Sequence, residues 1–205
     1  MATLALILYV VYLVLTVGLR MLIQVRRTGS TGFHGLGGRV GSAEWIAGVG
    51  FTVALLVGAA APLLALLDLV EPIAALDTTS VHVAGLFLAV AGIGATFYAQ
   101  MAMGSSWRIG VDPAERTELV TSGPFALVRN PIFAAMLPTA LGLTLLVPSW
   151  VALAGLAGLV AALELQVRVV EEPYLLQAHR DAYGSYAARV GRFAPGVGRL
   201  ARPSS

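Results

Sequence analysis

The chain has 205 residues, of which 58% are hydrophobic and only 12% are charged, and its mean hydropathy is +0.83. Soluble domains contain about 45–50% apolar and about 25% charged residues. This composition therefore excludes a water-soluble domain, a disordered chain and a basic nucleic-acid-binding domain. The chain has no cysteine, which excludes disulfides and cysteine-ligated metal sites, and we expect no bound metal.

Apolar stretches long enough for membrane helices recur along the chain. A helix needs roughly 20 apolar residues to cross a bilayer core of about 30 Å. Five stretches meet or approach this length: Leu4–Leu19 (continuing to Val25), Trp45–Leu67, Val81–Met103, Ile132–Val147 and Trp150–Val167. The first has neither the basic start nor the cleavage site of a signal peptide. We therefore predict an all-α integral membrane protein with five transmembrane helices.

The basic residues predict the orientation of these helices. All 13 are arginine, and they fall after the first, third and fifth stretches: Arg20, Arg26, Arg27 and Arg39; Arg108, Arg116 and Arg129; Arg168, Arg180, Arg189, Arg192, Arg199 and Arg202. The loop after the second stretch has only acidic charges. The positive-inside rule then predicts an external N-terminus and a cytoplasmic C-terminus. The alanine-, glycine- and arginine-rich composition indicates a GC-rich bacterial genome, so we expect the bacterial plasma membrane.

The turns agree with this arrangement. Pro148 and Ser149 predict a tight hairpin between the last two spans, with Ser149 as helix N-cap, and the third span is expected to be capped by Thr78, Thr79 or Ser80. We divide the chain into residues 1–103, three helices with a glycine-rich cytoplasmic loop at 26–43, and residues 104–205. The second part contains a cytoplasmic loop, a transmembrane hairpin at 131–170 and an amphipathic C-terminal segment.

Polar residues gather in two cytoplasmic segments, Ser105–Asn130 and Glu164 to the C-terminus. In the first, Asp112-Pro113-Ala114-Glu115 is typical of a capping box that opens a short helix. Asn130 and Pro131 then predict an N-cap and a first helical residue for the fourth span. A cytoplasmic site must be built from these two segments.

The second polar segment contains three charged residues at helical spacing. Arg168 and Glu172 are four residues apart, which predicts a shared helix face, and Pro173 is expected to end or kink the helix. Glu164 lies one turn deeper in the membrane, where ionisable groups are usually paired or functional, and Arg168 is its expected partner. The simpler interpretation is an interfacial arginine that reaches the lipid head groups. Residues 174–190 are amphipathic, with Leu175, Leu176, Tyr183 and Tyr186 facing the membrane or the site.

Two blocks of residues resemble the isoprenylcysteine carboxyl methyltransferase family. The first runs from Leu119-Val120-Thr121-Ser122-Gly123-Pro124-Phe125 to Arg129-Asn130-Pro131-Ile132-Phe133, and it is similar to the family's G-P-Y…R-H-P-x-Y. The second contains Arg168, Glu172, Tyr183, Tyr186, Arg189-Val190 and Arg192-Phe193-Ala194-Pro195, and it is similar to R-x-x-x-E…Y-x-x-Y…R-V-x-R-F-x-P. The resemblance covers residues 107–195. Phospholipid methyltransferases and, more distantly, membrane sterol reductases share this half.

The resemblance implies a pocket for S-adenosylmethionine at the cytoplasmic face, with a lipophilic acceptor drawn from the membrane. The residues that match the family's cofactor contacts are Leu119, Val120, Phe125, Asn130, Pro131, Ile132, Phe133 and Glu172. Glu172 is expected to hold the cofactor's ammonium group and Arg168 to orient the acceptor, so both are the candidate catalytic residues. The chain departs from the family at Asn130, where the motif has histidine, and at Phe125 and Phe133, where it has tyrosine.

The chemistry of the acceptor stays open at this stage. A carboxylate is already ionised at pH 7, needs no general base, and suits bidentate binding by Arg168. An amine or phenol needs a base, which Glu164, Glu171 or His179 would supply. Two other classes are a nicotinamide-dependent membrane reductase of related fold and a non-catalytic membrane protein. Polar residues collected at one face, rather than at mid-membrane, disfavour a transporter.

Overall fold

The computed structural model describes residues 1–33, 35, 37–110 and 118–201. Its first helix is continuous and consists of α1 (Ala2–Leu13), a π-helical turn η1 (Val14–Leu19) and α2 (Arg20–Thr28). The other elements are α3 (Ala43–Leu66), α4 (Thr79–Ala102), the 3₁₀ turns η2 (Gly104–Ser106) and η3 (Gly123–Ala126), α5 (Pro131–Leu146), α6 (Trp150–Leu165), the π-helical turn η4 (Gln166–Glu171) and α7 (Glu172–Ala187).

The helices confirm the prediction of an all-helical integral membrane protein. In the described residues, four helices are long and apolar enough to cross a membrane: Ala2–Thr28, Ala43–Leu66, Thr79–Ala102 and Trp150–Ala187. The fourth expected span is α5, a shorter apolar helix of 16 residues. The orientation of these helices across the bilayer stays a prediction.

Side-chain caps begin three of the helices. Ser149 Oγ accepts a hydrogen bond from the Ala152 N–H at 3.2 Å, as expected for the start of α6. Thr78 is the residue that caps α4, through the Val81 N–H at 3.4 Å. Ser42 caps α3 in the same way. Each cap satisfies a backbone donor that the first helical turn leaves unpaired. The expected capping box at residues 112–115 lies outside the described residues.

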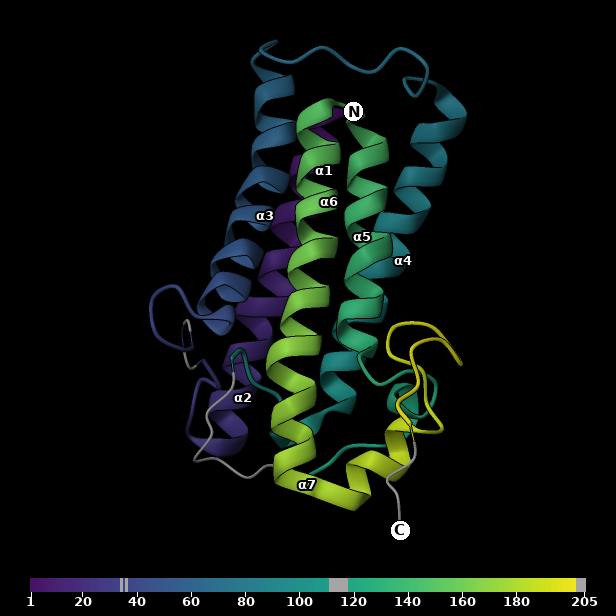
Figure 1. Ribbon diagram of the computed structural model, residues 1–205. Coiled ribbons are helices and arrows are strands. Elements are labelled where there is room, and N and C mark those ends of the chain that lie inside the picture. The colour runs from purple at the N-terminus through teal and green to yellow at the C-terminus, as the bar shows by residue number, and fades with distance from the viewer. Residues whose placement is uncertain (34, 36, 111–117, 202–205) are drawn as a thin grey trace.

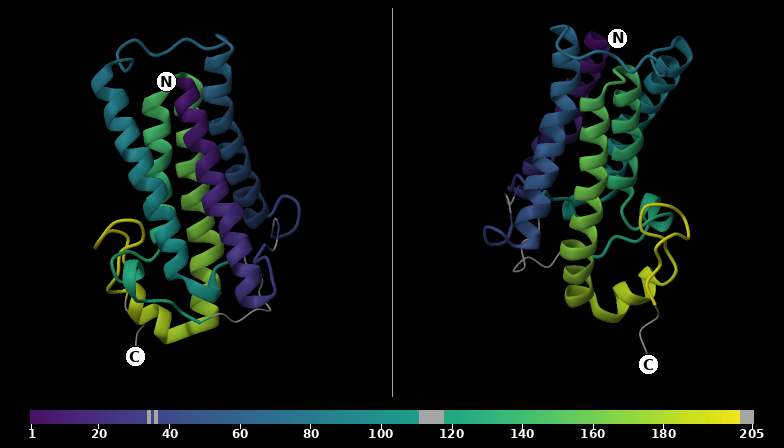
Figure 2. Two further views of the ribbon diagram at one scale, coloured as in Figure 1. Left: turned by 180° about the vertical axis from the view of Figure 1, so that it is seen from behind. Right: turned by 45° about the horizontal axis from the view of Figure 1, so that its top comes forward.

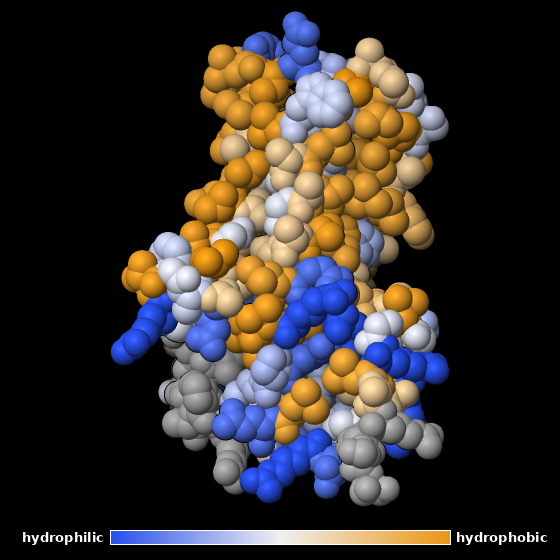
Figure 3. All heavy atoms as spheres, viewed as in Figure 1, coloured by the Kyte–Doolittle hydropathy of each residue, from blue (hydrophilic) through white to orange (hydrophobic). Residues whose placement is uncertain are grey.

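The helices lie side by side as a bundle whose two ends differ. Figures 1 and 2 show the N-terminus, the α3–α4 loop and the α5–α6 hairpin at one end, and α2, α7 and the C-terminal segment at the other. We call the second end the arginine end, because every described arginine belongs to α2, to the connections there, or to the chain after α6. In Figure 3, hydrophobic residues dominate the surface of the opposite half, and hydrophilic residues gather at the arginine end.

Small residues bring α4 and α5 into backbone contact. A Cβ on Gly92 would lie 2.7 Å from the Thr139 backbone nitrogen, and one on Gly85 would lie 2.8 Å from the Gly142 carbonyl oxygen. Helices associate closely in membranes through such small residues, since lipid provides no hydrophobic drive for their association. A cluster of buried apolar side chains fills the space between α1, α3, α4, α5 and α6: Tyr12, Ala54, Ile93, Met136, Leu159 and Leu163.

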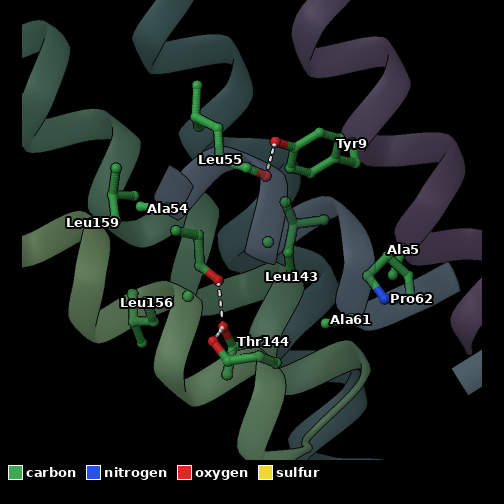
Figure 4. Close-up of a pocket in the computed structure, with 14 residues that line it drawn as sticks. Ala5, Tyr9, Ala54, Leu55, Ala61, Pro62, Leu143, Thr144, Leu156 and Leu159 are labelled. Atoms are coloured by element: carbon green, nitrogen blue, oxygen red, sulfur yellow. Dashed lines mark hydrogen bonds between the residues drawn. The ribbon is translucent and has the colours of Figure 1, made fainter. Parts of the chain in front are cut away.

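A small apolar cavity lies between α1, α3, α5 and α6. Its volume is about 50 Å³, and Figure 4 shows its lining, with the Tyr9 hydroxyl donating to the Leu55 carbonyl at 2.7 Å. The remaining lining is mostly alanine, glycine and leucine. The cavity has none of the charged groups that the candidate chemistry requires, so the functional site must be sought at the arginine end.

Candidate active site

Glu172 lies at the centre of a buried charge cluster. Its Oε1 accepts hydrogen bonds from Arg129 Nη2 at 2.5 Å and from Arg192 Nε at 2.8 Å, and its Oε2 accepts one from Arg192 Nη2 at 2.9 Å. The side chains of Arg129 and Glu172 are 1% and 8% exposed. Charge-assisted and bidentate pairs of this kind are the strongest hydrogen bonds in proteins. We call these three residues the Arg–Glu–Arg cluster.

Arg129 also holds the C-terminal segment against the start of α5. Its Nη1 donates to the carbonyls of Ala187 at 3.1 Å and Val190 at 2.5 Å, and its Nη2 also donates to the Gly198 carbonyl at 2.9 Å. The Arg129 N–H donates to the Gly191 carbonyl at 2.8 Å. One arginine therefore joins the residue before α5, the end of α7 and the chain that follows it.

The shape of α7 brings Glu172 to this position. The π-helical turn η4 ends at Glu171, and Pro173 lies in the first turn of α7, where its missing N–H costs little. Figure 1 shows that α7 leaves the axis of α6 at this point, as the proline predicts. A second kink follows at Arg180, which has a φ of 42°.

Two tyrosines on the last turns of α7 pack against the loop before α5. Tyr183 and Tyr186 are buried, with rings 6.1 Å apart in an edge-to-face arrangement. The Tyr186 hydroxyl donates to the Phe125 carbonyl at 2.6 Å, and Leu119 packs against the same pair of rings. The expected amphipathic tail therefore turns these tyrosines toward the site.

The cluster has one more positive than negative charge. Arg129 and Arg192 face a single carboxylate, and all three groups are buried or nearly so. The hydrogen bonds to Glu172 raise the pKa of Arg192 above its ordinary value. A buried cluster with an unbalanced charge is rarely the most stable choice for a protein core. This imbalance favours a functional role over a purely structural one.

The structure brings most of the expected cofactor residues to the arginine end. Phe125 and Pro131 are buried beside the cluster, Asn130 follows Arg129 directly, and Leu119 contacts the tyrosine pair. Val120 is half-buried. Ile132 and Phe133 continue into the bundle along the first turn of α5, where they pack on the apolar core.

Arg168 and Glu172, which were expected to share a helix face, do not pair with each other. Arg168 Nε instead donates to Glu164 Oε2 at 2.5 Å, and the two side chains are 59% and 39% exposed. An acid that precedes its base by four residues is the more favourable order on a helix, and Glu172 has two buried arginines of its own. The structure therefore confirms the predicted Glu164–Arg168 pair and separates it from the Arg–Glu–Arg cluster.

Asn130 occupies the N-cap position of α5 without making the expected side-chain cap. Its Nδ2 donates to the Arg192 carbonyl at 3.3 Å, and its backbone N–H donates to the same oxygen at 3.1 Å. The C-terminal segment lies against Asn130, as the adjoining bridge between Val128 and Gly191 also shows. Because the C-terminal segment offers the Arg192 carbonyl as an acceptor, the Asn130 side chain donates a hydrogen bond to it and does not cap the helix.

The sequence assigned no role to Arg129 and Arg192, which are the partners of Glu172. Both stood within the motif blocks, in Arg129-Asn130-Pro131 and in Arg192-Phe193-Ala194-Pro195. A general rule could have identified these two arginines from the sequence: a glutamate near a membrane is usually paired with a cation. Two arginines at the edges of the same blocks were the candidates.

The acceptor capacity of Glu172 fits the binding of S-adenosylmethionine. A carboxylate offers about four acceptor positions, and Arg129 and Arg192 use three of them. From the described residues Oε2 accepts a single hydrogen bond, so it retains an acceptor position for a further donor such as an ammonium group. The adjoining apolar residues Leu119, Ile132 and Phe133 are half-buried and can contact a planar ring.

The apolar helical bundle defines an integral membrane protein, and the charged cluster at one end of the bundle is its candidate site. A family model described as phospholipid methyltransferase matches residues 80–182. This is half of the chain, and the chain belongs to that family. No curated protein and no solved structure matches the chain.

Membership of this family establishes the activity. The protein is a methyltransferase that uses S-adenosylmethionine, and its family methylates membrane phospholipids. The family is related to the isoprenylcysteine carboxyl methyltransferase-like membrane enzymes that the motif blocks resemble. The matched region contains Glu164, Arg168 and Glu172, whereas Arg20 and Arg192 lie outside it.

Proposed function

We propose that the protein methylates the amine of a zwitterionic phospholipid head group at the arginine end of the bundle. The observation that carries this proposal is the exposed pair formed by Glu164 at the end of α6 and Arg168 in η4. It presents one anion and one cation at the edge of an apolar helix, eight and four residues before Glu172. A head group with a phosphate and an ammonium is complementary to such a pair.

The two members of the pair have different roles. Arg168 uses Nε for Glu164, and its two Nη groups have no partner among the described residues. They can hold a phosphate in the bidentate manner that a lysine cannot reproduce. Glu164 then lies beside the ammonium, and it accepts the proton that an amine must lose before it attacks. Glu171 and His179 are the alternative bases, but neither forms a hydrogen bond or ion pair with Arg168 in the described part of the chain.

Glu172 is proposed to bind the cofactor, together with Leu119, Val120, Phe125, Asn130, Pro131, Ile132 and Phe133. When bound, S-adenosylmethionine supplies a sulfonium methyl group to a nucleophile and leaves as S-adenosylhomocysteine. Glu172 Oε2 accepts from the amino-acid ammonium, while Arg129 and Arg192 keep the carboxylate ionised and fixed in direction. The protein contributes alignment and exclusion of water at the membrane edge.

A lipophilic carboxylate is the second candidate acceptor. It is supported by the same two Nη groups of Arg168, which match a carboxylate as well as a phosphate. Such an acceptor needs no base, so Glu164 would serve only to orient Arg168. The resemblance to the isoprenylcysteine carboxyl methyltransferases adds to this possibility, whereas the family match favours the phospholipid amine.

The stability of the methylated product in alkali distinguishes the two candidate acceptors. The purified protein is incubated with methyl-labelled S-adenosylmethionine and either phosphatidylethanolamine or a prenylated cysteine carboxylate. An N-methyl product resists mild alkali, whereas a methyl ester releases labelled methanol. We expect alkali-stable label on phosphatidylethanolamine. Alkali-labile label on the carboxylate alone would replace the amine with the second candidate.

Two variants test the residues. Glu172→Gln keeps the shape of the side chain and loses a charge-assisted bond of roughly 1.5–3 kcal/mol, so cofactor affinity should fall by about tenfold to a hundredfold. Arg168→Lys should leave cofactor affinity almost unchanged and lower turnover, because lysine cannot make the planar contact. Calorimetry and turnover rates measure the two effects. Unchanged affinity in Glu172→Gln would remove Glu172 from the cofactor site.

We also propose that the arginine end faces the cytoplasm of a bacterial cell. The described arginines all lie at this end, and the acidic residues Asp68, Glu71 and Asp77 lie in the loop at the opposite end. Reporter fusions after Gly35 and Ser205 should read as cytoplasmic, and a fusion after Asp77 should read as external. An external C-terminus would contradict the orientation.

A further inference from the structure

Arg20 is a buried cation in the first membrane helix, outside the region that matches the family. Its exposed fraction is 0%. None of the described carboxylates forms an ion pair with it, and its Nε is buried without a hydrogen-bond partner in the described part of the chain. Charged groups within membrane helices are costly and usually functional.

Arg20 and Gln24 together hold two successive carbonyl groups of η2, the turn that follows α4. Arg20 Nη2 donates to the Gly104 carbonyl at 2.6 Å, and Gln24 Nε2 donates to the Ser105 carbonyl at 2.8 Å. Arg20 Nη1 also donates to Gln24 Oε1 at 3.0 Å, which fixes the two side chains relative to each other. We call this pair the Arg20–Gln24 clamp.

Further contacts tie the same helix to the end of α4. The Arg20 guanidinium lies over the Trp107 ring, 4.4 Å from its centroid, and Trp107 itself is 2% exposed. One turn earlier, Gln100 Nε2 donates to the Thr16 carbonyl at 3.0 Å. Thr16 belongs to the π-helical turn η1, and such turns occur frequently at functional sites.

Arg20 carries a desolvation cost that an apolar side chain at the same position would not carry. None of the described carboxylates neutralises its charge, so its two hydrogen bonds and the Trp107 ring offset only part of this cost. A methionine or leucine at position 20 would pack against Trp107 at lower cost. The charged residue is therefore explained by what it holds, which is the turn η2.

From η2 the chain leads to both parts of the candidate site. Ser106 Oγ donates to the Glu118 carbonyl at 3.4 Å, directly before Leu119 and Val120. Arg108 lies over the Tyr174 ring, 5.4 Å from its centroid, two residues after Glu172. A displacement of η2 would thus reach the apolar side of the cofactor site and the first turn of α7.

We infer that Arg20 and Gln24 are positioning residues, which fix η2 so that Leu119 and Val120 are held at the cofactor site. This inference rests on the proposed cofactor contacts of Leu119 and Val120. It gives the N-terminal helix a part in cofactor binding, although this helix lies outside the family match. The clamp acts through backbone carbonyls, so its loss affects binding of the cofactor and not the transfer step.

The test compares Arg20→Met with Arg26→Met, a matched control on the same helix at an exposed position. Calorimetry should show S-adenosylmethionine affinity about tenfold lower in Arg20→Met, as for a lost charge-assisted hydrogen bond, and unchanged in Arg26→Met. The KM for S-adenosylmethionine should rise by the same factor, while kcat at saturating cofactor and the KM for phosphatidylethanolamine stay near the wild-type values. Arg20→Lys should recover part of the affinity, because its ammonium can still donate to the Gly104 carbonyl.

Trp107 provides a readout of the clamp that does not depend on activity. Trp45 and Trp150 are first replaced by phenylalanine, so that Trp107 is the only fluorescent tryptophan. In Arg20→Met the fluorescence emission of Trp107 should shift to the red, and its ring should become accessible to quenching by acrylamide. Gln24→Met removes the contact with the Ser105 carbonyl and the one with Arg20 Nη1 but leaves the bond from Arg20 to Gly104. It should give a smaller change in the same direction, and it keeps the test available if Arg20→Met does not fold. Wild-type cofactor affinity in both variants would overturn the inference alone, whereas a wild-type protein that does not bind S-adenosylmethionine would overturn the proposed function.

Discussion

The apolar half of the bundle and its arginine end are stabilised in opposite ways. In the apolar half, α4 and α5 approach through Gly85, Gly92 and Gly142, and buried threonines such as Thr96 and Thr139 donate to carbonyls of their own helices. These threonines are thus satisfied within their own helices, and the close contact of α4 with α5 depends on small residues and shape.

At the arginine end, few side chains make many long-range contacts. The Arg129 guanidinium donates to four groups from three distant parts of the chain, and Arg20 joins α2 to a turn 84 residues away. The comparison shows that one membrane protein can use close packing where only shape is required and multiple charged hydrogen bonds where irregular backbone must be positioned. Substitutions in the two regions should therefore fail in different ways.

The largest effect is expected from Arg129→Met. It removes one cation from Glu172 and leaves the carbonyls of Ala187, Val190 and Gly198 without their donor. Breaking a buried pair of this type costs on the order of 3 kcal/mol. We expect a large fall in the melting temperature in detergent and loss of cofactor binding. Arg189→Met, at an exposed position, is the control, and an equal response of both variants would contradict the role of Arg129.

Gly92→Ala should have the next largest effect and should leave the site intact. The new Cβ would lie 2.7 Å from the Thr139 backbone nitrogen, so α4 and α5 must separate. Overpacking of this kind costs about 2 kcal/mol. Gly94→Ala is the matched control, because a Cβ at Gly94 meets nothing within 4 Å. We expect a lower melting temperature only in Gly92→Ala, with unchanged cofactor affinity in the protein that stays folded.

Tyr186→Phe tests the connection between α7 and the loop before α5. It removes the hydroxyl that donates to the Phe125 carbonyl at 2.6 Å and keeps the packing of the ring. The lost hydrogen bond should cost about 1 kcal/mol. Thermal unfolding is compared with Tyr98→Phe, in which the exposed Tyr98 loses its hydroxyl without consequence. No difference between the two variants would show that this bond does not hold the loop.

The smallest effect is expected at Asn130. Asn130→Leu removes a single long bond to the Arg192 carbonyl, which the backbone N–H of residue 130 also serves, so stability should fall by about 0.5 kcal/mol. Asn130→His restores the residue of the related family and should keep cofactor affinity, as measured by calorimetry. A loss of cofactor affinity in Asn130→Leu with unchanged stability would support the proposed contact with the cofactor, and unchanged affinity would remove Asn130 from the cofactor site.

The sequence predicted the membrane helices well, because they depend on local patterns. Apolar length and capping residues located α3, α4, α5 and α6 to within two residues of their observed ends. The Glu164–Arg168 pair was also predictable, since both residues lie on one helix at i, i+4 spacing. Motif order placed Glu172 and Phe125 at the same end of the bundle.

The sequence by itself determined that this chain is a bundle of apolar helices with its charges at one end, because hydrophobic length and arginine placement act residue by residue. Only the tertiary structure decided that Glu172 pairs with Arg129 and Arg192, and that Arg20 holds η2. The partners of Glu172 are 43 and 20 residues away in the chain. A helical pattern cannot rank such partners against a nearby Arg168. The choice depends on which cations the folded backbone buries together with the carboxylate.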